Sequence, residues 1–108
     1  MRFIKAVVLP GLLVVLAGPA LAAEPASERR AHLLNMVKQD CGSCHGLTMK
    51  GGLGPPLVPA VIAERDAEQM AFVILNGRPG TPMPPWRDFL KTGEAEWIVE
   101  QLRKGLPK

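Results

Sequence analysis

Residues 40–46 read DCGSCHG, and this short stretch holds both cysteines of the 108-residue chain and one of its two histidines. Two residues separate Cys41 from Cys44, and His45 follows directly. A thioredoxin-type redox pair would need a βαβ context, which the sequence does not show. A zinc site needs about four nitrogen or sulfur ligands, but the stretch offers three, and His32 lies on an expected helix among charged residues. The spacing C-x-x-C-H is instead typical of covalent haem attachment.

Haem attachment explains why these residue types occur at this spacing. Both thiols add to vinyl groups on one edge of the porphyrin, and the next residue presents its imidazole to the iron. A haem also supplies apolar mass to a small domain whose two cysteines can form at most one disulfide. We therefore expect one covalent haem c, with Cys41 and Cys44 as the thioether residues and His45 as the proximal iron ligand.

The first 22 residues have the pattern of a secretory signal peptide. MRFIK carries two basic residues, an apolar run follows, and Ala20-Leu21-Ala22 fits the small-residue rule for cleavage. An uncleaved membrane anchor is the alternative, but prolines and glycines interrupt the apolar run. We expect cleavage after Ala22, a periplasmic location, and a mature cytochrome domain at residues 23–108.

Cleavage also changes the charge of the protein. The whole chain has 13 basic and 10 acidic residues, a net charge of +3. Loss of Arg2 and Lys5 leaves about +1, which gives no indication of nucleic-acid binding.

The rest of the chain predicts an all-α domain with three main helices and two rigid, Pro/Gly-rich loops around the haem. Apolar residues recur at helical spacing in three segments, and glycines and prolines dominate the segments between them. No strand pattern appears. The expected helices are 28–38, 67–76 and 93–104, with a short helical turn at 61–64, and the expected loops are 46–59 and 78–86.

The ends of these helices also have recognisable signals. Ser27, Asp66 and Thr92 are the expected N-caps, because their side-chain oxygens can accept backbone N–H groups. Gly42 is expected to end the first helix, and Gly77 the second.

Four methionines and one histidine are candidates for the iron ligand opposite His45. Met83 differs from the others because it lies in GTPMPPW, where flanking prolines restrict the backbone. A thioether is a weak ligand that needs such a rigid support, and His/Met ligation is typical of electron-transfer haems. We therefore expect Met83 to be the distal ligand. The remaining candidates are Met36, Met49, Met70 and His32, for which core packing, short reach and solvent exposure are the simpler interpretations.

The loop GLGPPL offers an acceptor for the second ring nitrogen of His45. A metal-bound histidine usually donates its other N–H to a carbonyl or carboxylate. Pro55 lies ten residues after His45 in a rigid segment. We expect its carbonyl to accept that N–H.

The motifs CGSCH, GPPL and MPPW, followed by a C-terminal helix with an aromatic residue, resemble those of the class I cytochromes c. The resemblance covers about Leu33 to Arg103 and implies the all-α class I cytochrome c fold, in which the N- and C-terminal helices cross near the haem edge. It also implies that Leu57, at the end of GPPL, packs against the haem. The stretches DCGSCHGLTMKGGLGPPL and LNGRPGTPMPPW resemble more closely the small periplasmic NirC-type cytochromes of denitrification, encoded beside the haem-cd nitrite reductase.

This resemblance implies a monomeric, periplasmic single-electron carrier, not an enzyme, that donates electrons to haem-cd nitrite reductase. A role in maturation of the reductase's d-type haem is an open alternative with the same motifs. A five-coordinate haem sensor or enzyme would require displacement of Met83. Lys50 and Arg78 in the two haem loops, and Arg87 directly after the second, are the fixed charges of this region, which predicts a basic docking face for an acidic partner.

Overall fold

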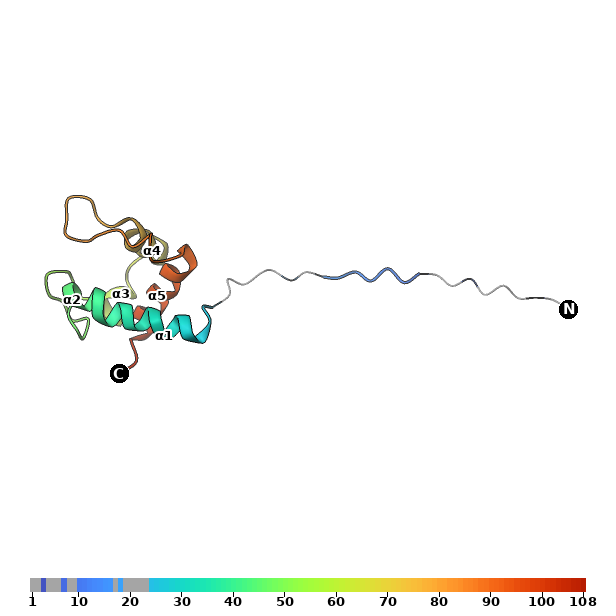
Figure 1. Cartoon of the computed structure of the whole chain (residues 1–108), viewed down its shortest axis with the longest axis horizontal. Helices are drawn as coiled ribbons and strands as arrows, with labels where there is room; N and C mark the ends of the chain where they lie inside the picture. Colours follow the sequence, from blue (N-terminus) through green and yellow to red (C-terminus); the bar gives the residue numbers. More distant parts are fainter. Residues whose placement is uncertain (1–2, 4–6, 8–9, 17, 19–23) are drawn as a thin grey trace.

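The protein was analysed as a computed structural model, which describes residues 3, 7, 10–16, 18 and 24–108. The cleavage site predicted after Ala22 lies outside these residues. Within them, no helix has the length and apolar character needed to cross a membrane. The domain that follows Glu24 is built from helices and loops, which confirms the all-α prediction (Figure 1).

Residues 24–108 form three main helical segments and one short helix. The first segment is continuous and comprises α1, a π-helical turn η1, and α2. The prediction that Gly42 ends this segment was wrong, because the helix stops only at Gly46, whose φ of +92° favours glycine. The elements are α1 (Ser27–Met36), η1 (Val37–Cys41), α2 (Gly42–His45), α3 (Pro59–Ile62), α4 (Ala67–Asn76) and α5 (Thr92–Lys104).

Two of the three predicted N-caps were wrong. Asp66 does cap α4, since its carboxylate accepts the N–H of Gln69 at 2.7 Å. Ser27 and Thr92 are instead the first helical residues of α1 and α5.

Backbone and carboxylate acceptors explain these two helix starts. The Ala26 carbonyl accepts the N–H of Arg30 at 2.8 Å, so α1 begins one residue earlier than expected. At α5, the Lys91 carbonyl accepts the N–H groups of Glu94 at 3.0 Å and Ala95 at 3.1 Å, so the helix begins at Thr92. The Glu94 carboxylate in turn accepts the N–H of Lys91 at 3.0 Å.

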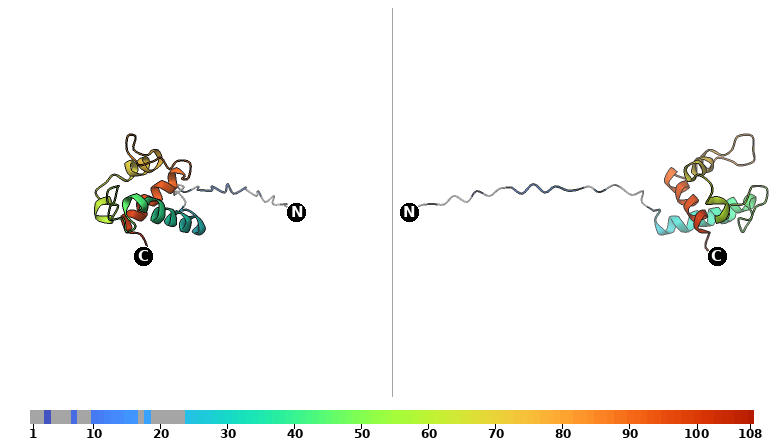
Figure 2. Two further views of the ribbon diagram at one scale, coloured as in Figure 1. Left: turned by 60° about the vertical axis from the view of Figure 1, so that its left-hand side comes forward. Right: turned by 180° about the vertical axis from the view of Figure 1, so that it is seen from behind.

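One hydrophobic core joins the helices. Helix α5 packs against α3 and α4, and α1 crosses α5 in both Figure 1 and Figure 2. Arg29 of α1 stabilises this crossing, because its guanidinium donates hydrogen bonds to the Glu94 carboxylate of α5 and, at 2.9 Å, to the Phe89 carbonyl. Each large apolar side chain that is fully buried contributes about 1.5–3 kcal/mol. The core residues are Leu33, Val37, Met49, Ile62, Ala71, Leu75, Leu90, Ala95, Ile98, Val99 and Leu102.

The two Pro/Gly-rich segments lie at one end of the domain. Figures 1 and 2 show the loop after α2 and the loop after α4 at the end of the domain away from the start of α1. The fold therefore brings together the segments on which the predicted site residues lie.

Candidate haem-binding site

The two cysteines lie where the first helical segment ends. Cys41 is the last residue of η1 and Cys44 lies in α2; both are half-buried and carry free thiols. Burial and, to a smaller extent, the neighbouring Asp40 carboxylate raise the pKa of the Cys41 thiol in the polypeptide to about 11. This environment differs from that of redox-active cysteines, whose thiol pKa is lowered.

The imidazole of His45 is oriented by the loop that follows it. Its Nδ1 atom lies 2.8 Å from the carbonyl oxygen of Pro55. A carbonyl can only accept, so Nδ1 donates its proton and Nε2 is left with a free lone pair. A neutral histidine in this tautomer is a metal ligand through Nε2.

A glycine that the sequence had not singled out makes this arrangement possible. The Gly54 N–H donates to the Cys44 carbonyl at 2.8 Å, so the loop folds back onto the helix end. A Cβ atom at Gly54 would lie 2.6 Å from Cε1 of His45 and 2.7 Å from its Nδ1. Any side chain there would displace the imidazole. The sequence offered one signal for this role, because Gly54 lies directly before Pro55, the predicted hydrogen-bond acceptor of His45.

Met83 lies half-buried in the loop between α4 and α5. Short hydrogen bonds close this loop, since Thr81 Oγ1 donates to the Arg78 carbonyl at 2.6 Å and Arg78 N–H donates to the Met83 carbonyl at 3.1 Å. The loop also presses on the end of α4, because a Cβ at Gly77 would lie 2.7 Å from Met83 O. Gly77 was expected only as a helix stop; its second role is close packing against the backbone of Met83.

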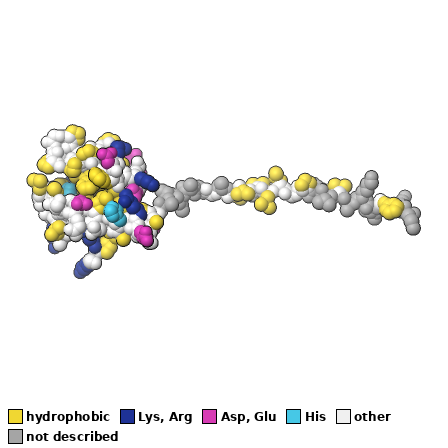
Figure 3. Space-filling view, viewed as in Figure 1, with side chains coloured by type: hydrophobic (Ala, Val, Ile, Leu, Met, Phe, Trp, Pro, Cys, Tyr) yellow, Lys and Arg dark blue, Asp and Glu magenta, His cyan; other side chains and the backbone are white. Residues whose placement is uncertain are grey.

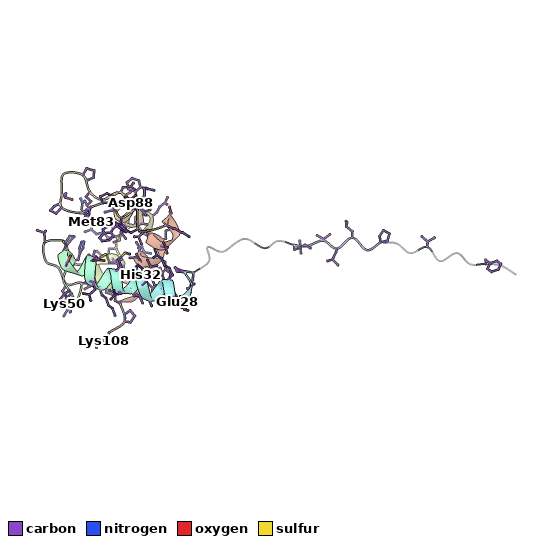
Figure 4. All side chains as sticks on the ribbon, viewed as in Figure 1. Glu28, His32, Lys50, Met83, Asp88 and Lys108 are labelled. Atoms are coloured by element: carbon purple, nitrogen blue, oxygen red, sulfur yellow. The ribbon has the colours of Figure 1, made fainter. Side chains whose placement is uncertain are left out.

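The other candidate ligands occupy different surroundings. Met49 is buried, and its Cε would be 3.5 Å from a Cβ at Gly42, so its side chain packs against the first residue of α2. Met36 and Met70 pack against the core, and so does the half-buried Leu57. His32 is exposed on α1. In Figure 4 Met83 lies in the upper part of the domain and Lys50 at its lower left, whereas Glu28 lies at the lower right.

The residues present fit a covalently attached haem. Two free thiols lie at one helix end next to His45. The Nδ1 atom of this histidine is hydrogen-bonded to Pro55, and its Nε2 atom remains available to bind iron. A second loop brings a methionine that is not part of the core to the same end of the domain. Hydrophobic side chains also gather on the face shown in Figure 3, and apolar surface of this kind suits a porphyrin.

Comparison with known proteins identifies the family. Residues 28–100 match the family described as "Cytochrome C oxidase, cbb3-type, subunit III". Cytochrome c55X of Paracoccus denitrificans (strain Pd 1222) is 53% identical over 93 residues, which cover 86% of this chain and 90% of the relative.

Two solved structures are also similar. The c-type cytochrome NirC superposes with a TM-score of 0.72 at 45% identity, covering 74% of this chain and 94% of NirC. Dihydro-haem d1 dehydrogenase NirN, solved in complex with DHE, gives a TM-score of 0.60 at 34% identity, but the match covers 68% of this chain and only 16% of NirN. The chain therefore belongs to the small c-type cytochromes of the cytochrome c55X and NirC family, and its cofactor is covalently bound haem c with iron.

Proposed function

We propose that this cytochrome is a periplasmic single-electron carrier whose haem iron is bound by His45 and Met83, and that residues 1–22 are removed as a signal peptide. The observation that carries the ligand assignment is the placement of the methionines. Of the four in residues 24–108, Met83 alone is neither buried nor packed against the core. Met83 lies on a loop closed by hydrogen bonds, at the same end of the domain as His45.

Each residue of the site has a simple task in this proposal. Haem c supplies a reversible one-electron couple when it is bound. Cys41 and Cys44 attach it, and the Pro55 carbonyl fixes the tautomer and orientation of the proximal histidine. A protein that fills both axial positions leaves no open site for a substrate, so transfer of an electron to a partner is the chemistry that remains.

The resemblance of its motifs to the NirC-type cytochromes of denitrification favours haem-cd nitrite reductase as the partner. The chain is similar to a NirC cytochrome along nearly the whole length of that protein. The loop after α2 is exposed at Leu47 and Leu53, which have 75% and 76% of their surface accessible, and it carries Lys50 between them. An apolar surface with a cation and no carboxylate in the same loop suits an acidic partner.

A second function is supported by a separate observation. A segment of dihydro-haem d1 dehydrogenase is similar to this chain in sequence and fold. This similarity favours a role for the cytochrome in maturation of a d-type haem, where it would exchange electrons with an assembly enzyme instead of the finished reductase.

Visible spectra of the oxidised and reduced protein test the site. We expect a c-type spectrum with the weak near-red charge-transfer band of methionine-bound ferric haem. Met83→Ala should abolish that band and lower the midpoint potential, since methionine ligation raises it. Met49→Ala is the matched control and should weaken folding without removing the band. If Met49→Ala removes the band and Met83→Ala does not, the assignment is wrong.

A gene deletion separates the two candidate functions. A strain that lacks an electron donor should still contain nitrite reductase with its full complement of d-type haem, but should reduce nitrite slowly. A strain that lacks a maturation factor should accumulate reductase deficient in d-type haem. N-terminal sequencing of the periplasmic protein tests cleavage after Ala22.

A further inference from the structure

The spacing of buried residues along the first helical segment changes just before the haem-attachment motif. Leu33 and Val37 are fully buried, with 0% and 1% of their surface exposed, and are four residues apart. Four residues later the same stripe would reach Cys41, but Cys41 is only half-buried and packs against the core from its edge. The next buried residue is Gly42, five residues after Val37.

The backbone shows where this extra residue is accommodated. The N–H of Gly42 is shared between the Gln39 carbonyl, three residues earlier, and the Val37 carbonyl, five residues earlier, whereas an α-helix would direct it to the residue four earlier. The bond to Val37 is the one that defines a π-helix. This bond belongs to the π-helical turn η1, which ends at Cys41. Ser43 Oγ, which donates to the Asp40 carbonyl at 2.7 Å, satisfies an acceptor within the turn.

The extra residue changes the direction in which the cysteines point. An α-helix turns by about 100° per residue, so residues four apart share a face. Without η1, Cys41 would follow Leu33 and Val37 into the core, and the glycine after it would lie outside. With η1, Gly42 takes the core position, where it has no side chain to bury. The Cys41 thiol is left at the edge of the core.

We infer that η1 sets the rotational register of the haem-attachment motif, by placing Cys41 at the edge of the hydrophobic core and not inside it, so that its thiol is available to the porphyrin. This inference rests on the proposed role of Cys41 and Cys44 as the thioether residues. The residues of η1 therefore act as positioning residues for covalent attachment, and none of them touches the reacting atoms except Cys41 itself. Their side chains matter less than their number.

Deletion of Gln39, an exposed residue of η1, tests this inference. Co-expression with a haem-attachment system, followed by mass spectrometry and thiol labelling of the purified haem protein, counts the thioether bonds. We expect two bonds in the wild type, and in the deletion variant one bond through Cys44 with about one free thiol per chain at Cys41. A pyridine haemochrome spectrum gives a second readout, because an unreacted vinyl group shifts its bands.

A pair of compensating insertions keeps the test decisive if the deletion variant does not accumulate. Alanine inserted after Val37 restores the four residues that separate Val37 from Gly42 in the wild type, and should restore both thioether bonds. Alanine inserted after Glu28 restores the length of the chain but not the register, and should not. Length-preserving Gln39→Ala should behave as the wild type.

Three results would overturn the inference: both thioether bonds in the deletion variant, equal rescue by the two insertions, or loss of a bond in Gln39→Ala. Failure of the underlying assignment is distinguishable from these results. In that case the wild-type protein itself would carry haem without bonds to Cys41 and Cys44.

Discussion

Replacement of Gly77 by alanine should break the distal side of the haem site through the backbone alone. Gly77 ends α4 with φ +68° and ψ −173°, a region that is essentially restricted to glycine and costs other residues about 1–3 kcal/mol. The new Cβ would also lie 2.7 Å from the carbonyl oxygen of Met83 and 2.8 Å from backbone atoms of Pro84 and Pro85. Ordinary contact begins at 3.4 Å, so the loop has to move by several tenths of an ångström.

A thioether is a weak iron ligand, and such a displacement should release it. We expect Gly77→Ala to lose the near-red charge-transfer band of the ferric protein and to have a lower midpoint potential. The free energy of unfolding should also fall, by roughly 1–3 kcal/mol, and the denaturation midpoint with it. Absorption spectroscopy, redox titration and unfolding in guanidinium chloride measure these three quantities on the same preparation.

Two other glycines provide matched controls. Gly80 lies in the same loop with φ +79°, but a Cβ there meets no atom within 4 Å. Gly80→Ala should therefore lose about 1 kcal/mol of stability and keep the band. Gly93 lies within α5 in open space, and its replacement by alanine should stabilise by about 0.5–1 kcal/mol. If Gly77→Ala loses stability but keeps both the band and the potential, the close packing of Gly77 does not position Met83.

Three further outcomes are expected. The hydrogen bond from Arg29 is the main cause that lowers the pKa of Glu94 to about 2 from an ordinary value of 4.5. This carboxylate therefore stabilises the fold above pH 4.5, and the stabilisation is lost as the pH falls toward 2. Glu94→Gln should remove this part of the acid dependence, and identical curves of stability against pH for the wild type and the variant would contradict the prediction. Stopped-flow electron transfer to haem-cd nitrite reductase should slow as salt is added and slow further in Lys50→Glu and Arg78→Glu; a rate that is indifferent to salt and to both variants would exclude a basic docking face. Gly54→Ala should push the proximal imidazole from its place and lower the yield of haem protein, and a normal yield with an unchanged spectrum would show that the loop adapts.

Much of the fold could be predicted because local signals and tertiary packing agree. The spans of α4 and α5 follow from apolar periodicity, and Asp66 caps α4 as its side chain predicts. Two of the N-cap predictions failed because backbone carbonyls, those of Ala26 at α1 and Lys91 at α5, accept the first helical N–H groups instead of the expected hydroxyls. At α5 a contact between segments adds to this, since the Glu94 carboxylate, which accepts from Arg29 of α1, also accepts the N–H of Lys91.

The sequence by itself determined the chemistry of this protein. A C-x-x-C-H motif admits few uses, and a methionine among prolines is a rigid loop residue in any fold, since both properties depend on covalent structure and local backbone restriction. Only the tertiary structure decided which groups support that chemistry. Gly54 lies against the imidazole and Gly77 against Met83, and both close approaches depend on how each loop folds back, which the position of Gly54 before Pro55 only suggests. The π-helical turn η1 also could not be predicted from the sequence. The extra residue in this turn is recognised only once the structure shows which side chains of the segment are buried in the core.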